Sequence, residues 1–76
     1  MPLMNPFAMM HLRINGKEAD LAATTIAELL AEQGIDPKTR FLAVAVNGAV
    51  VRRAEWPTAF LAADDNVEIV RPFQGG

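Results

Sequence analysis

The sequence contains no cysteine, no serine and no tyrosine, and it has a single histidine, His11. Without thiols the chain can form no disulfide, thiolate metal site or thiol nucleophile. Most of the groups that serve nucleophilic or acid–base catalysis are missing as well. We therefore expect no enzyme and no metal site, and we interpret His11, which has no second histidine or cysteine as a companion ligand, as a surface or structural residue.

Basic charge is also scarce, with 7 Lys and Arg against 9 Asp and Glu and a pI near 5.2. A chain without a basic surplus is a poor partner for nucleic acid. Residues 1–10 contain two prolines and no positively charged side chain, and they have no apolar run long enough for a signal or membrane segment. We expect a flexible leader over residues 1–10, in which Met4, Met9 and Met10 are each possible natural starts.

The composition is otherwise that of one small globular domain. Of the 76 residues, 51% are hydrophobic and 21% are charged, which is unlike the low-hydrophobicity signature of disorder. A chain of this length buries roughly 60% of the surface that its unfolded form exposes. The hydrophobic core must therefore be small.

Two Asn-Gly pairs predict two β-hairpins with type I′ turns. Asn15-Gly16 joins residues 11–14 to 17–21, and Asn47-Gly48 joins residues 41–46 to 49–51. In the run 41–46 alternate residues point to opposite faces of a strand. One face would carry Leu42, Val44 and Val46, and the other Phe41, Ala43 and Ala45.

Between the hairpins the sequence predicts one short amphipathic helix. Thr25 and Glu28 form a capping box, in which the hydroxyl and the carboxylate each satisfy a free backbone N–H. Gly34 supplies a left-handed residue that ends the helix, with Ile35 placed for a hydrophobic contact, and Pro37 prevents continuation.

Residues 53–61 indicate an irregular crossing with a helical turn. A small domain has few large side chains with which to fill its core, so we expect Trp56 and Phe60 to be buried there. Asp64 and Asp65 precede Asn66, which is typical of a turn rather than of a cation site.

The last strand is predicted over residues 67–71, and Pro72 removes a donor that further strand pairing would need. The order hairpin, helix, hairpin, crossing and strand predicts an α+β domain with one helix on one face of a mixed sheet of about five strands. A β-grasp fold meets this description. We expect a leader over residues 1–10, a domain over residues 11–73 and a mobile tail over residues 74–76.

If the helix covers one face of the sheet, the apolar residues of the other face need an explanation. Phe41, Ala43 and Ala45, together with Val70, are candidates for a partner-docking surface. Phe73 is a stronger candidate because it adjoins the tail. The alternative is that these are scattered surface residues, or that the leader covers them.

Several segments together resemble the ThiS family of ubiquitin-like sulfur carriers, and the likeness extends from about His11 to the end of the chain. The segments are Val44-Ala45-Val46-Asn47-Gly48-Ala49-Val50-Val51, Arg53-Ala54-Glu55-Trp56, Val67-Glu68-Ile69-Val70 and Gln74-Gly75-Gly76. A Gly-Gly end alone occurs in many ubiquitin-like proteins. The order and spacing of the other segments are more specific.

The resemblance implies a sulfur carrier of the cytoplasm that supplies sulfur for thiazole formation in thiamine biosynthesis and is not an enzyme itself. A ThiF-type adenylyltransferase would activate Gly76 with ATP, a persulfide donor would supply sulfur, and the thiocarboxylate would deliver it to a ThiG-type thiazole synthase. The chain itself would bind no cofactor. Gly75 and Gln74 would thread into the partner's channel, since glycine lacks the Cβ that would crowd attack on the acyl carbon.

Three other functions fit the same sequence features. The small subunit of molybdopterin synthase would share the fold and the thiocarboxylate but give its sulfur to a pterin precursor. A ubiquitin-like modifier would transfer the activated Gly76 to an amine. A non-covalent binding module would not use its Gly-Gly tail at all.

Overall fold

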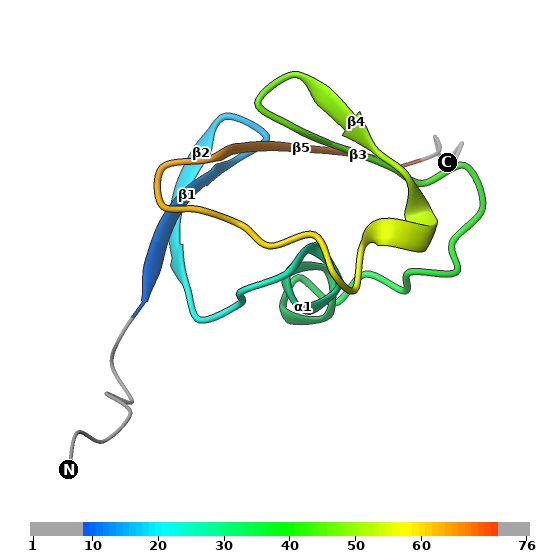
Figure 1. Cartoon of the computed structure of the whole chain (residues 1–76), viewed down its shortest axis with the longest axis horizontal. Coiled ribbons are helices and arrows are strands. Elements are labelled where there is room, and N and C mark those ends of the chain that lie inside the picture. Colours follow the sequence, from blue (N-terminus) through cyan, green and yellow to red (C-terminus); the bar gives the residue numbers. More distant parts are fainter. Residues whose placement is uncertain (1–8, 72–76) are drawn as a thin grey trace, which may run out of the picture.

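The computed structural model describes residues 9–71, which form a five-stranded sheet with one α-helix against it (Figure 1). In chain order the elements are β1 (Met10–Ile14), β2 (Lys17–Leu21), α1 (Ile26–Glu32), β3 (Ala43–Val46), β4 (Ala49–Val51), the 3₁₀ helix η1 (Arg53–Glu55) and β5 (Asn66–Val70). The strand order is β2-β1-β5-β3-β4. Because β1 and β5 run parallel and the other pairs are antiparallel, the sheet is mixed. The predicted α+β, β-grasp arrangement is confirmed.

Both predicted Asn-Gly turns are present, and both have the backbone angles of type I′ turns. The φ angles are 50° and 84° at Asn15 and Gly16, and 52° and 86° at Asn47 and Gly48. A type I′ turn requires positive φ at both central residues, which asparagine and glycine tolerate best. These turns set the register of the two hairpins, so that Ile14 pairs with Lys17 and Val46 pairs with Ala49.

Helix α1 begins and ends at the predicted residues. The Thr25 hydroxyl accepts a hydrogen bond from the Glu28 N–H at 3.2 Å, while the Glu28 carboxylate accepts one from the Thr24 N–H at 2.7 Å. At the other end Gly34 has a φ of 72°, and the Ile35 N–H donates to the Leu30 carbonyl at 2.9 Å. The left-handed Gly34 and the hydrogen bond from Ile35 to Leu30 belong to a Schellman motif, which satisfies the last carbonyls of the helix.

The hydrophobic core lies between α1 and the inner face of the sheet. Its largest fully buried side chains are Leu12, Ile26, Leu29, Leu30, Val44 and Val67. Trp56 is 2% exposed, and its indole N–H donates to the Val51 carbonyl at 2.9 Å, so its predicted place in the core is confirmed. The same prediction for Phe60 is wrong because its side chain is 74% exposed. The backbone bridge between Phe60 and Thr25 explains how an exposed residue is still fixed in place.

The crossing and the last turn follow the sequence prediction in outline. Helix η1 is the expected helical turn. The Asp65 carboxylate accepts from the Ala62 N–H at 2.8 Å and from the Asn47 side-chain amide at 2.9 Å, which is the expected turn chemistry. Within residues 9–71 there is no helix long and apolar enough to cross a membrane.

Candidate functional site

Strand β5 is the central strand of the sheet, and it leads directly to the C-terminal residues. It lies between β1 and β3, and at its end Val70 pairs with Ala43. Gly76, Gly75, Gln74 and Phe73, the tail residues predicted from sequence, fall outside the described residues. The described part of the candidate site is therefore the surface from which the tail leaves.

The asparagine of each hairpin turn binds β5 through its side chain. Pairing between β1 and β5 ends at Ile14 and Val67. Beyond that point the Asn15 side chain takes the place of a neighbouring strand: its Oδ1 accepts from the Ile69 N–H at 2.7 Å and its Nδ2 donates to the Ile69 carbonyl at 3.2 Å. At the start of β5 the Asn47 Oδ1 accepts from the Asn66 N–H at 2.9 Å. Both ends of β5 are thus fixed, and the contact at Ile69 is the one close to the tail.

The sheet face opposite the helix is half polar and half apolar. Four outward residues of β5, β3 and β4 form a surface that we call the apolar strip, which consists of Ala43, Ala45, Val50 and Val70. The exposed Glu68, which pairs with Ala45, lies beside it on the same face. Val50 is 74% exposed, Val70 is 59% exposed, and Ala43 is exposed while Ala45 is half-buried. The strand pairs place Ala43 beside Val70 and Ala45 beside Val50. Because two of its four members are alanines, few side-chain atoms project from the strip, and a partner protein can approach it closely.

Of the five predicted docking residues, Phe73 lies outside the described residues, and the structure brings three of the other four together and separates the fourth. Ala43, Ala45 and Val70 share the strip, and their docking role stays a prediction. Phe41 was expected on the same strand face, but β3 begins at Ala43 and Phe41 has a φ of 63°, outside the strand region. Its side chain is 75% exposed, and the Arg40 guanidinium lies 5.2 Å from the ring centroid.

Sequence reasoning missed Val50, the more exposed of the two valines of the strip. The signal was present in the second Asn-Gly turn, because a two-residue loop makes Val46 and Ala49 a pair and therefore places Ala45 opposite Val50. Extending the register by one residue from the turn would have found it.

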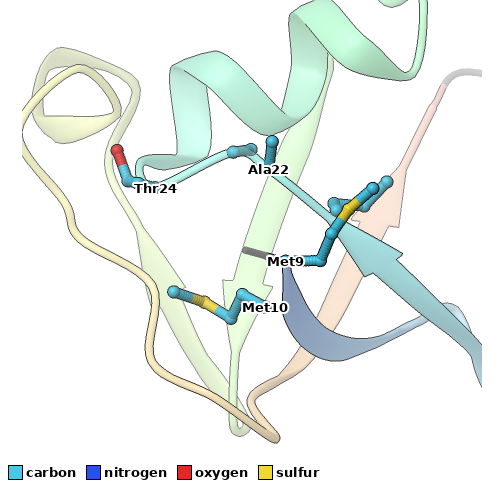
Figure 2. A pocket seen from close by; sticks show the side chains of 6 residues that line it. Met9, Met10, Ala22 and Thr24 are labelled. Atoms are coloured by element: carbon cyan, nitrogen blue, oxygen red, sulfur yellow. The ribbon is translucent and has the colours of Figure 1, made fainter. Parts of the chain in front are cut away.

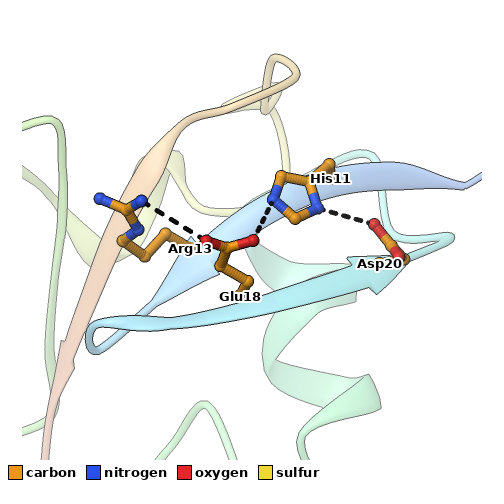
Figure 3. A network of polar contacts seen from close by, with 4 residues as sticks. All are labelled: His11, Arg13, Glu18 and Asp20. Carbon is orange, nitrogen blue, oxygen red and sulfur yellow. Dashed lines mark hydrogen bonds and ion pairs between the residues drawn. The ribbon is translucent and has the colours of Figure 1, made fainter.

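The polar half of the open face carries His11 and its partners (Figure 3). The His11 Nδ1 lies 2.8 Å from the Asp20 carboxylate, its Nε2 lies 3.2 Å from Glu18, and the Arg13 guanidinium lies 3.7 Å from the same Glu18. The hydrogen bond with Asp20 raises the pKa of His11, and the negative charges of Asp20, Glu18 and Asp64 add to the effect. All these side chains reach solvent, so the network is an exposed cross-strand ion cluster.

The cluster does not form a metal site. Over residues 9–71, no group of three or more His, Asp or Glu side chains could hold a metal ion. A shallow hollow of about 280 Å³ beside the cluster is lined by His11, Arg13, Asp64 and Asn66. Its lining carries both signs of charge, which gives no preference for one class of ligand.

An apolar hollow of about 250 Å³ lies at the start of β1 (Figure 2). The start of β1 and the end of β5 lie at opposite ends of the sheet (Figure 1). The lining of the hollow consists of Met9, Met10, Leu21, Ala22, Ala23 and Thr24. None of these residues belongs to a predicted site. Their side chains carry no group for acid–base or nucleophilic chemistry apart from the Thr24 hydroxyl, which donates to Glu28 at 2.8 Å.

Comparison with known proteins identifies the family. The model of the ThiS family matches residues 12–76, which includes the last three residues of β1, all the elements from β2 to β5, and the Gly-Gly end. The chain belongs to the ThiS family. No curated protein sequence matches the chain significantly.

Two solved structures of a ThiS-family relative have the same fold. The crystal structure of the thiamine biosynthesis protein ThiS from Geobacter metallireducens is 26% identical, with a TM-score of 0.72, and the match covers 88% of this chain and 100% of that one. The solution structure of a thiamine biosynthesis protein from the same organism is 26% identical, with a TM-score of 0.71 and 88% coverage of both chains. The sequence prediction of family and fold is therefore confirmed.

Proposed function

We propose that this chain is the sulfur carrier for thiazole formation in thiamine biosynthesis. The observation that carries the proposal is the match to the ThiS family over residues 12–76, because it extends through Gly75-Gly76. The relatives with the same fold are thiamine biosynthesis proteins, which supports this pathway over that of a pterin cofactor.

In the proposed cycle, the chemistry takes place on the Gly76 carboxylate. A ThiF-type adenylyltransferase joins it to AMP from ATP and releases pyrophosphate. The terminal sulfur of a persulfide donor then attacks the acyl carbon and displaces AMP, which leaves an acyl persulfide. A thiol of the donor or another thiol reductant cleaves its S–S bond, forming a disulfide and releasing the thiocarboxylate, which a ThiG-type thiazole synthase takes as its sulfur source. The chain holds no ATP itself, and its own part is to present Gly76.

The described residues give this role a physical basis at the base of the tail. A carrier must place its end deep in two different partners, so the strand before the tail has to be firmly held. The two neighbouring strands and the Asn15 side chain hold β5 as far as Ile69. The ladder with β3 ends at the pair of Val70 and Ala43, and Pro72 follows two residues after Val70. The apolar strip lies on the same strand and is our candidate for the docking surface.

A complementation experiment tests the pathway. A thiazole-requiring strain that lacks its own carrier is supplied with the intact gene or with the gene lacking Gly76. We expect growth with the intact gene alone. Growth of a molybdenum-cofactor strain in its place would favour the molybdopterin synthase subunit, and equal growth with and without Gly76 would favour a non-covalent module.

Mass spectrometry tests the chemistry at Gly76. Replacing oxygen by sulfur adds nearly the same mass as oxidising a methionine, and the chain has four methionines. Cleavage after Glu68 releases residues 69–76, which contain no methionine. After co-expression with the activating enzyme and the sulfur donor, we expect the mass increase on this peptide and none when the enzyme is omitted.

A further inference from the structure

The positive charges of this acidic chain gather at the end of the sheet where β5 leads into the tail. Residues 36–41 precede β3, residues 52–55 follow β4, and residue 71 follows β5, and these segments lie together at one end of the sheet (Figure 1). They carry five of the seven Lys and Arg residues of the chain. We call this group, which consists of Lys38, Arg40, Arg52, Arg53 and Arg71, the basic rim.

The charge separation is large for a chain of this size. The segments of the basic rim include two carboxylates, Asp36 and Glu55, so five positive and two negative side chains give that end a charge of +3. The formal net charge of the chain is −2, so the remaining residues together carry −5. The molecule therefore has a basic end at the root of the tail and an acidic remainder.

Contacts within the described residues hold part of the rim in place. The Arg53 Nη2 donates to the Thr39 carbonyl at 3.0 Å, and the Arg53 guanidinium lies 4.8 Å from the centroid of the buried Trp56 ring. Arg40 lies over the Phe41 ring. All five cations are exposed, and none pairs with a carboxylate of residues 9–71. Their charge is thus available to a partner.

We propose that the basic rim docks on an acidic surface of the activating enzyme, at the mouth of the channel that receives the tail. The apolar strip adjoins the rim, since Val70 precedes Arg71 and Ala43 pairs with Val70. The partner surface that fits is therefore apolar opposite the strip, with aspartate or glutamate residues toward the tail. This inference rests on the proposed function and adds the chemistry of the partner surface to it.

The rim also orients the encounter between carrier and enzyme. An acidic partner repels the remainder of the chain and attracts the basic end, so the tail approaches first. Such steering depends on exposed charges and weakens when salt shortens the Debye length from about 10 Å at 0.1 M to about 3 Å at 1 M.

Pyrophosphate exchange by the ThiF-type enzyme from the same source, with the full chain as varied substrate, tests the inference. We compare Arg52→Gln/Arg71→Gln with Arg13→Gln/Lys17→Gln, which changes net charge equally but lies outside the rim. At low salt we expect the rim variant to raise KM roughly fivefold or more, with kcat little changed, and the control to stay within about twofold. At about 1 M salt the difference should shrink to within about twofold.

The outcomes separate the inference from the proposed function. If the wild-type chain supports no exchange, the proposed function fails and the rim's role fails with it. If exchange occurs and requires Gly76, but both double variants have the same KM at low salt, the rim has no docking role. A lower KM for the rim variant would show a basic partner surface. If the wild-type chain sediments as a dimer and the rim variant as a monomer, the rim binds a second copy of the chain. Either this result or a lower KM for the rim variant would overturn the inference.

Discussion

The side chain of Asn15 binds both backbone groups of Ile69, 54 positions later in the chain. It does so at the point where β1 has ended and β5 continues toward the tail. The amide has the donor and acceptor of a peptide group, so it continues the ladder by one residue. The same residue adopts the positive φ that its hairpin turn requires. One asparagine thus serves the turn and the strand before the tail.

We predict that Asn15→Gly destabilises the domain by about 1–3 kcal/mol, since the part-buried N–H and carbonyl of Ile69 lose their partner. Glycine keeps the positive φ, so the change removes the side chain without straining the turn. Urea unfolding measures the effect. Gly16→Asn measures the separate cost of a side chain at the φ of 84° in the same turn and should leave the Ile69 contacts intact. Stability of Asn15→Gly within about 0.5 kcal/mol of the wild type would show that water replaces the amide without loss.

Trp56 and Phe60 are similar in chemistry and opposite in environment, which allows a paired test. Trp56→Ala should cost about 3–5 kcal/mol, because it removes a buried aromatic ring and the hydrogen bond to Val51. Phe60→Ala should change stability by about 0.5 kcal/mol or less, because its ring is mostly exposed. Circular dichroism during urea unfolding compares the two variants, since fluorescence would be lost with Trp56. Equal losses would mean that the ring of Phe60 packs in solution.

Local backbone chemistry explains how much of the fold the sequence predicts. An Asn-Gly pair needs no distant contact to form a type I′ turn, and Thr25, Glu28 and Gly34 define the helix through bonds within two turns of each end. Phe41 is different, because the left-handed φ that places it outside β3 is imposed by its surroundings and not by its β propensity. Aromatic character likewise could not distinguish buried Trp56 from exposed Phe60.

The candidate site was predictable to the extent that it depends on register. The face shared by Ala43, Ala45 and Val70 follows from strand alternation, and Val50 follows from the turn between β3 and β4. The basic rim was not predictable in this way. Its residues come from three separate segments, and only the sheet order brings them to one end.

The stability that Glu28 contributes at the start of α1 should decrease as the pH falls. Hydrogen bonds from the Thr24 N–H, the Thr24 hydroxyl and the Thr25 N–H lower the pKa of Glu28. A lowered pKa in the folded state gives stability that is present above the unfolded pKa and is lost as pH falls through the folded value. We predict that the stability difference between the wild type and Glu28→Gln is largest near neutral pH and shrinks below about pH 4. Glu32→Gln, on the same helix, is the control; an unchanged difference at low pH would contradict the assignment.

The stability that His11 contributes has the opposite dependence on pH, and the titration of this residue can be followed directly. Its pKa is raised, so the stability that it contributes is present below the ordinary value of 6.5 and is lost as pH rises through the folded value. It is the single histidine of the chain, so its NMR titration is unambiguous. Asp20→Ala should lower the pKa of His11, because it removes the hydrogen bond that raises it most. Glu68→Ala, a carboxylate elsewhere on the open face, should leave it unchanged; equal titration curves for the two variants would show that Asp20 is not the cause.

The apolar strip can be tested by substituting two exposed residues of equal accessibility. Val50 and Phe60 are each 74% exposed, but Val50 belongs to the strip and Phe60 does not. If the strip docks on the activating enzyme, Val50→Gln should raise the KM for the carrier about tenfold, since losing a buried valine side chain from an interface costs about 1.5 kcal/mol. Phe60→Gln should leave the KM within about twofold. Thermal unfolding checks that both variants remain folded, and a larger effect at Phe60 would move the docking surface from the sheet to the helix side of the domain.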